Sequence, residues 1–130
     1  MRIFKTKWFR RFARKEGISD ETLREAVGRA ESGLIDGDLG GGLIKQRVAR
    51  PGKGRSGGFR TLLAYRAGDL AVFLYGFAKS ERENIDDSEL KVWQELGAGW
   101  LRANDTHWNR QVREGLAEEV ENDESSDDKA

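Results

Sequence analysis

A segment without acidic residues carries most of the chemistry that this sequence can offer. Between Leu39 and Gly68 it contains no Asp or Glu, whereas its cations are Lys45, Arg47, Arg50, Lys53, Arg55, Arg60 and Arg66. The same segment contains Gly52, Gly54, Gly57 and Gly58, whose backbone N–H groups a polyanion can approach closely. Because arginine forks and accessible N–H groups both bind phosphate oxygens, the segment predicts a phosphate-binding site. The competing interpretation is a solvated sheet face with a flexible turn.

The net charge of the whole chain conceals this segment. The 130 residues include 23 Lys and Arg and 23 Asp and Glu, which gives a net charge of zero. Residues 1–66 hold 16 Lys and Arg against 7 Asp and Glu, a net +9, and residues 67–130 hold 7 against 16, a net −9. This asymmetry predicts a basic functional face and an acidic C-terminal tail.

Residue types and spacings disfavour several other classes of site. The segment lacks the spacings of a Walker loop and of a dinucleotide-binding fingerprint, so we expect no nucleotide cofactor. The chain has no cysteine and therefore neither a disulfide nor a thiolate metal site, and we expect its one histidine, His107, to be a surface or packing residue. We accordingly expect no metal and no cofactor. No apolar run approaches the roughly 20 residues of a membrane helix and no signal peptide is recognisable, which predicts a soluble cytoplasmic protein.

Strands on either side of a turn must position the cations. Leu43 to Arg50 is a strand candidate, Pro51 to Gly58 breaks it, and Phe59 to Arg66 alternates as the returning strand of a hairpin. The next run, Leu70 to Lys79, is apolar almost throughout and is predicted to be a central strand. Lys79 would then lie one strand away from the hairpin.

Helices are predicted before and after these strands. Met1 to Lys5 can form a short edge strand, a basic helix that ends at Gly17 follows it, and Ser19 caps a second helix. Asp86 begins a capping box at the start of a third helix. The predicted order is β-α-α-β-β-β-α, in a single α+β domain of residues 1–120.

The C-terminal region allows two interpretations. Trp108, Val112 and Leu116 permit a short helix, whereas Leu116 to Val120 could add an edge strand. Residues 121–130 are predicted to be an acidic disordered tail, because they cannot bury enough apolar area to become ordered.

Three runs of residues resemble the HigB-like branch of the RelE/ParE toxins. They are Gly40 to Lys45, Gly54 to Arg60 and Tyr75 to Lys79, followed by Asn84 and Glu89-Leu90. The most specific feature is a basic residue-Ser-Gly-Gly-x-Arg run followed, one strand later, by aromatic-Ala-Lys. The resemblance covers roughly Met1 to Leu101. Arg55 stands where many relatives have Lys, and the long acidic tail is a second departure.

The resemblance implies both a fold and a function. The fold is a small α+β microbial RNase fold, in which two N-terminal helices pack on an antiparallel sheet of about four strands, with a C-terminal helix. The function is that of a toxin of a type II toxin–antitoxin system, which cleaves mRNA on the ribosome and is inhibited by a cognate antitoxin, expected to be a helix-turn-helix protein.

If the protein cleaves RNA without a metal ion, each cation has an expected role. The ribose 2′-OH attacks its own phosphate, so the site must stabilise the charge of the phosphorane and move protons. Arg55 and Arg60 suit charge stabilisation because a guanidinium stays protonated, and Lys53 or Lys79 would transfer the proton. The predicted RNA-binding residues are Lys45, Arg47, Arg50, Tyr65 and Arg66. Tyr65 could stack on a base, donate a hydrogen bond or pack in the sheet.

Two alternative functions remain open at this stage. A DNA gyrase inhibitor of the ParE kind shares the fold and needs no catalytic cations. A non-catalytic nucleic-acid-binding module would bind in a salt-dependent manner without cleaving.

Overall fold

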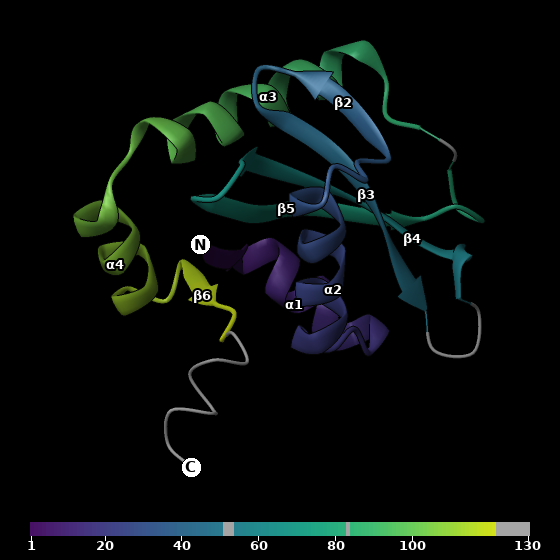
Figure 1. The fold of residues 1–130 in the computed structure, drawn as a ribbon, viewed down its shortest axis with the longest axis horizontal. Coiled ribbons are helices and arrows are strands. Elements are labelled where there is room, and N and C mark those ends of the chain that lie inside the picture. The colour runs from purple at the N-terminus through teal and green to yellow at the C-terminus, as the bar shows by residue number, and fades with distance from the viewer. Residues whose placement is uncertain (51–53, 83, 122–130) are drawn as a thin grey trace.

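The described residues fold into a single six-stranded sheet with four helices (Figure 1). The computed structural model describes residues 1–50, 54–82 and 84–121, and for residues 54–56 it describes the backbone alone. The elements in chain order are β1 (Arg2–Thr6), α1 (Lys7–Glu16), α2 (Asp20–Glu31), β2 (Gly37–Gly40), β3 (Leu43–Arg50), β4 (Gly54–Arg66), β5 (Leu70–Ala78), α3 (Asp87–Arg102), α4 (Asp105–Arg113) and β6 (Ala117–Glu119).

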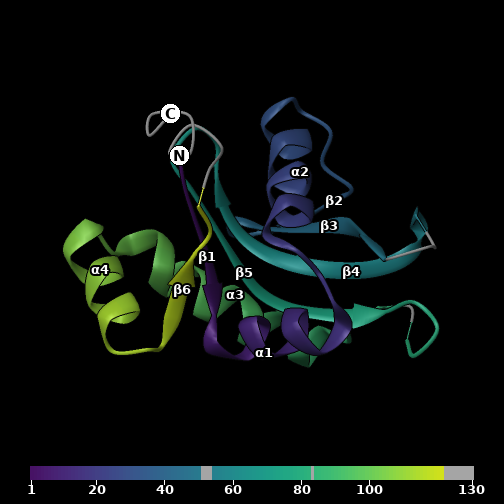
Figure 2. The same cartoon turned by 90° about the horizontal axis from the view of Figure 1, so that it is seen from below.

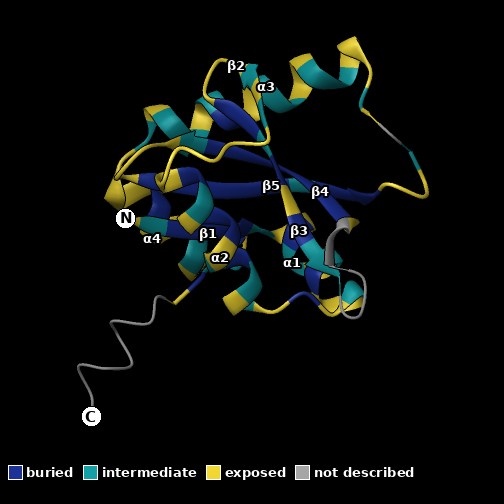
Figure 3. Ribbon diagram, turned by 45° about the vertical axis from the view of Figure 1, so that its right-hand side comes forward, coloured by how far each residue is buried: buried dark blue, intermediate teal, exposed yellow. Residues whose placement is uncertain are grey.

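The sheet has the strand order β2-β3-β4-β5-β1-β6. Neighbouring strands are antiparallel except β1 and β5, which run parallel with Arg2 opposite Leu70 and Lys5 opposite Phe73. The two longest strands, β4 and β5, lie in the middle, and Figure 3 shows them largely buried. The predicted hairpin and the predicted central strand are therefore confirmed.

Helices cover both faces of the sheet. On one face α1 and α2 pack against side chains such as Val48, Phe59 and Leu63. On the other face α3 and α4 pack against side chains such as Leu62 and Val72. Figure 2 shows α2 and α3 on opposite sides of the curved sheet. Side chains alternate between the faces along each strand, so a residue's position in the strand decides which helices it meets.

The predicted helix boundaries rest on recognisable caps. Ser19 accepts a hydrogen bond from the backbone N–H of Thr22, and Gly17 ends α1 in the left-handed conformation with φ 71°. Asp86 and Glu89 form the predicted capping box of α3. The N–H of Glu89 and the hydroxyl of Ser88 both donate to Asp86, which lowers the pKa of its carboxyl group.

Three parts of the predicted fold are wrong or incomplete. The sheet has six strands rather than about four, since Gly37–Gly40 pairs with β3 although its glycines suggested only a turn. The sheet is not wholly antiparallel, because the two helices after β1 provide the long connection that a parallel pair requires. Two helices instead of one follow β5.

The two interpretations of the C-terminal region are both realised, one after the other. Residues Asp105–Arg113 form α4, whose Trp108 packs on Phe4, and Ala117–Glu119 then forms the edge strand β6 on β1. Of the predicted acidic tail only Glu121 is described, and residues 122–130 lie outside the described part of the chain. Among the described residues no helix has the length and apolar character needed to cross a membrane.

The contact between Gly76 and Phe12 gives a first prediction. A Cβ at Gly76 would lie 2.6 Å from Cε2 of Phe12, whose ring is held by Phe9 and Phe59. We expect Gly76→Ala to lower the free energy of unfolding by about 1–3 kcal/mol, because α1 must shift away from β5.

The matched control for this prediction is Gly99→Ala. A Cβ at this α3 position would meet nothing within 4 Å, so the substitution should be neutral or stabilise by up to about 1 kcal/mol. Urea unfolding of both variants measures the difference. Equal stabilities would contradict the packing of Phe12 from α1 against Gly76 of β5.

Candidate functional site

Four cations from three adjacent strands converge on one cavity. The cavity has a volume of about 270 Å³ and is lined by Asp36, Lys45, Arg47, Arg60, Lys79 and Asn84. Lys45 and Arg47 belong to β3, Arg60 belongs to β4, and Lys79 directly follows β5. Asp36 precedes β2, and Asn84 lies between β5 and α3. We call this cavity the cationic pocket.

Strand register places the cations on the same face. Arg47 and Arg60 are directly opposite each other in the β3–β4 pair, and Arg60 is opposite Phe77 in the β4–β5 pair. Lys45 lies two residues from Arg47 in β3 and therefore projects to the same side of the sheet. Lys79 directly follows β5 and lines the same pocket. Like charges directly opposite each other destabilise a sheet. The arrangement therefore costs stability and calls for an explanation beyond folding.

Arg60 is the most unusual member of the pocket. Only 8% of the residue is exposed, and its Nη1 has no hydrogen-bond partner among the described residues. A buried guanidinium nitrogen without a partner carries the full penalty of desolvation. An anion that enters the pocket would supply the missing acceptor and the missing countercharge together. Arg60 thus gives the pocket a buried positive charge that an anion could neutralise.

The loop before α3 is held firmly at the mouth of the pocket. Lys45 Nζ donates to Asn84 Oδ1 at 3.3 Å, and Arg82 Nε donates to the backbone oxygen of Asn84 at 3.1 Å. Arg82 also forms a forked pair with Glu89 and lies over the Phe77 ring, 5.5 Å from its centroid. The hydrogen bond from Arg82 holds the pKa of the Glu89 carboxyl group below its usual range. The pair therefore ties this loop to the first turn of α3.

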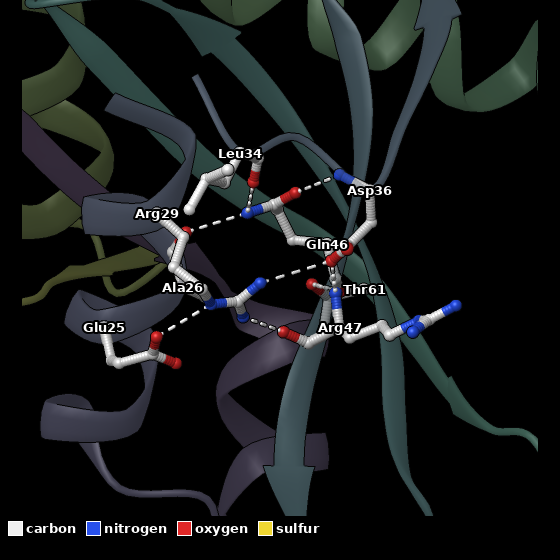
Figure 4. A network of polar contacts seen from close by, with 8 residues as sticks. All are labelled: Glu25, Ala26, Arg29, Leu34, Asp36, Gln46, Arg47 and Thr61. Carbon is white, nitrogen blue, oxygen red and sulfur yellow. Dashed lines mark hydrogen bonds and ion pairs between the residues drawn. The ribbon is translucent and has the colours of Figure 1, made fainter. Parts of the chain in front are cut away.

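The opposite wall of the pocket is fixed by the buried network in Figure 4. The fully buried Gln46 donates from Nε2 to the backbone oxygens of Ala26 and Leu34, at 2.9 and 3.3 Å. Its Oε1 accepts from the N–H of Asp36 at 2.7 Å. Oδ2 of Asp36 in turn accepts from the N–H of Arg47 at 2.7 Å. The chain of contacts links α2 through Gln46 to the backbone that carries Arg47.

This network gives a second prediction. We expect Gln46→Leu to lower the free energy of unfolding by about 2–4 kcal/mol, since two carbonyl groups and the N–H of Asp36 lose a buried partner. The variant should also release Asp36 and loosen the Arg47 wall. Amide hydrogen exchange at Asp36 and Arg47 measures this directly. Exchange rates equal to those of the wild type would show that Gln46 does not hold the wall.

The structure brings together four of the predicted site residues. Lys45, Arg47, Arg60 and Lys79 all line the cationic pocket. Arg50 lies near the end of β3 with its guanidinium over the Phe59 ring, and it is not among the pocket-lining residues. Lys53 lies outside the described residues, as does the side chain of Arg55.

Tyr65 and Arg66 lie at the far end of β4. Tyr65 is five residues from Arg60, about 17 Å along the strand, and its hydroxyl donates to the Glu31 carboxylate. Burial, reinforced by that hydrogen bond, raises the pKa of Tyr65 to about 12. Arg66 pairs with Asp69 at 2.6 Å and donates to the backbone oxygen of Leu101. Both side chains have protein partners away from the cationic pocket.

Sequence reasoning missed the polar walls of the pocket. Asp36 precedes the acid-free segment, and no pattern in the sequence marks it as a site residue. Only the pairing of β2 with β3 brings its loop beside Arg47. Asn84 was noted only as part of the resemblance. Gln46 is a lone polar residue in a strand, and its burial against the carbonyl groups of α2 has no signature in spacing.

Comparison with known families gives one finding. The family model described as RelE toxin of the RelE/RelB toxin–antitoxin system matches residues 1–120. No curated protein sequence matches the chain.

Proposed function

The chain belongs to the RelE family of toxin–antitoxin toxins, which are generally endoribonucleases, and we propose that it cleaves mRNA on the ribosome. The observation that carries the proposal is Arg60, a buried guanidinium in a pocket with four cations, whose Nη1 has no hydrogen-bond partner within the described part of the chain. A scissile phosphate is an anion of the right size and charge for such a site.

The proposed reaction needs no metal ion. The ribose 2′-oxygen attacks the adjacent phosphorus, the bond from phosphorus to the 5′-oxygen breaks, and the products carry a 2′,3′-cyclic phosphate and a 5′-hydroxyl. The 2′-OH loses one proton and the leaving 5′-oxygen gains one. Arg60 and Arg47 stabilise the additional negative charge of the phosphorane, and Lys45 positions the phosphate. Lys79, at the exposed end of the pocket, transfers the proton, with Lys53 as the other candidate.

The assignment to the HigB-like branch is part of the same proposal. Its two motif pieces lie on β4 and β5, and the pairing of Arg60 with Phe77 brings them side by side at the pocket. This proximity supports a shared role in one site. We further propose that a cognate helix-turn-helix antitoxin inhibits the protein in the cytoplasm, where its ribosomal substrate is found.

Inhibition of DNA gyrase is the less favoured function. A gyrase inhibitor acts by binding a protein. It has no need for a buried guanidinium that lies opposite a like charge and whose Nη1 finds no partner among the residues that the structure describes. Burial of the Arg60 guanidinium costs desolvation free energy. A non-catalytic binding module would not need to bear this cost, because its cations could remain on the solvated surface.

Mapping of RNA ends in cells tests the proposed function. The protein is induced, and the 5′ ends of mRNA are mapped with and without an inhibitor of translation initiation, beside an Arg60→Met variant as the inactive control. We expect new ends within coding regions that require both active translation and Arg60. Cuts that persist without translation would contradict ribosome dependence. Double-strand breaks in DNA without RNA cuts would favour the gyrase inhibitor.

A further inference from the structure

The cations of this protein fall into two groups according to their partners. Arg2, Lys5, Arg29, Arg66 and Arg82 each bond to at least one carboxylate. A second group of cations has no such partner among the described residues and includes Lys79 and the guanidinium groups of Arg47 and Arg60 in the cationic pocket. The largest further set of this kind lies on one helix, α1: Lys7, Arg10, Arg11, Arg14 and Lys15. These five form no ion pair or side-chain hydrogen bond with any described residue.

The five cations share one side of α1. They occur at positions i, i+3, i+4, i+7 and i+8, which are neighbours on a helix surface. The opposite side carries Phe9 and Ala13, which are buried against the sheet. Like charges at i and i+4, such as Lys7 and Arg11, destabilise a helix by about 0.2–0.5 kcal/mol per pair. The outer side of α1 is therefore a row of mutually repelling charges.

The other helices show that this pattern is not general in the chain. The first turns of α2, α3 and α4 contain Asp20, Asp87 and Asp105, which interact favourably with the helix dipole. The first turn of α1 has no acid and begins with Lys7, whose charge opposes the dipole. Helix stability does not account for this choice of residues, whereas binding to a polyanion would.

An exposed indole borders the basic side. Trp8 is 44% exposed, and its ring lies 4.7 Å from that of Tyr75 and 5.4 Å from that of Phe12. Trp8 and Lys7 also line an apolar cavity of about 360 Å³ beside Trp93. Cations combined with an accessible aromatic ring are the usual means of holding a single-stranded nucleic acid.

Helix α1 packs on the face of the sheet opposite the cationic pocket, against the same part of β4 and β5. Phe12 contacts Phe59, and a Cβ at Gly76 would touch its ring. These two residues immediately adjoin Arg60 and Phe77, which face each other in the β4–β5 pair. Figure 2 shows α1 beside β5. The first turn of α1 reaches the pocket face, because Trp8 contacts Tyr75, whose ring lies 5.9 Å from that of Phe77. A strand that leaves the pocket across β5 would therefore meet Trp8 and the start of the basic side of α1.

We propose that the outer side of α1 is a second RNA-binding surface, which holds the phosphate backbone outside the cleavage pocket through Lys7, Arg10, Arg11, Arg14 and Lys15. This inference rests on the proposed ribonuclease function. The bound strand is the mRNA beyond the scissile phosphate, because the contact of Trp8 with Tyr75 connects the start of α1 to the pocket face.

The test compares two triple variants with the same change in net charge. Lys7→Gln/Arg10→Gln/Arg11→Gln neutralises the basic side of α1, and Lys91→Gln/Arg110→Gln/Arg113→Gln neutralises three cations of α3 and α4 that have no partner among the described residues. The probes are an uncleavable 2′-O-methyl RNA oligonucleotide and purified ribosomes. Affinity is measured over a range of salt concentrations.

We expect the α1 variant to bind RNA with roughly tenfold or more lower affinity. The slope of the logarithm of the binding constant against the logarithm of the salt concentration should become shallower by about 2, because three phosphate contacts are lost. Its melting temperature should not fall, because the substitutions remove repulsion. The control variant should bind within about threefold of wild type. Weaker binding to both probes supports the mRNA strand as the ligand. Weaker binding to ribosomes alone would assign the surface to ribosomal RNA and overturn the inference.

Other outcomes would overturn the inference. Equal RNA affinities and salt slopes for the two variants would show that the outer side of α1 is not an RNA-binding surface. If wild type binds RNA through α1 but cuts none under translation, the proposed nuclease function fails while the surface remains.

Discussion

Arg60→Met is expected to abolish RNA cleavage without destabilising the protein. Loss of a donor that stabilises the charge of a transition state costs about 10²–10³ in rate, and Arg60 is also the buried floor of the pocket. Replacement of a buried, unpaired charge by an apolar side chain of similar length is often neutral or stabilising. We therefore expect the free energy of unfolding to stay constant or to rise by about 1 kcal/mol or more.

Cleavage rates and urea unfolding of the purified variant measure both effects. Arg113→Met on the exposed end of α4 is the matched control and should change neither. A clear loss of stability in Arg60→Met would show that Arg60 is needed for folding. Cleavage at the wild-type rate by the folded variant would show that the pocket is not the active site.

The second large effect is expected at Lys79. If this ammonium group transfers the proton, Lys79→Arg should lose about 10²–10⁴ in rate, almost as much as Lys79→Ala, because a guanidinium cannot readily exchange a proton. If it only supplies charge, Lys79→Arg should retain most of the activity. The pH dependence of the cleavage rate distinguishes these cases further, since one ionisation should disappear in both variants.

Two further variants make the Lys79 experiment decisive. Lys91→Arg, on the exposed side of α3, should cleave at the wild-type rate. Lys53→Arg tests the other candidate. Loss of activity in Lys53→Arg together with its retention in Lys79→Arg would move the proton transfer to Lys53 and contradict the role given to Lys79.

The sequence predicted the strands of the site better than its walls. An acid-free run of cations on two strands and an apolar strand that ends in Lys79 were sufficient to place Arg60 and Lys79 near each other. Alternation along the strands then puts Lys45, Arg47 and Arg60 on one face. These features depend on local patterns, which can be recognised without knowledge of the tertiary structure.

The parts that could not be predicted depend on long-range contacts. The glycine-containing strand β2 forms because β3 is available to pair with it, and only this pairing brings Asp36 to the pocket. Tyr65 shares a strand with Arg60, yet the distance along β4 and the contact with Glu31 place it elsewhere. In the sequence, Arg60 and Tyr65 are both polar residues of the same predicted strand. Composition therefore does not show that only Arg60 lines the pocket.

RNA cleavage in the cationic pocket is proposed to proceed by attack of the 2′-OH. Its most direct test is the chemistry of the new RNA ends, produced by the purified protein on translating ribosomes and compared with ends from an mRNA that carries a single 2′-O-methyl group at the mapped site. We predict 2′,3′-cyclic phosphate and 5′-hydroxyl ends, no cleavage at the methylated site, and no cleavage by Arg60→Met. Fragments with 3′-hydroxyl and 5′-phosphate ends, or cleavage of the methylated site, would contradict the account.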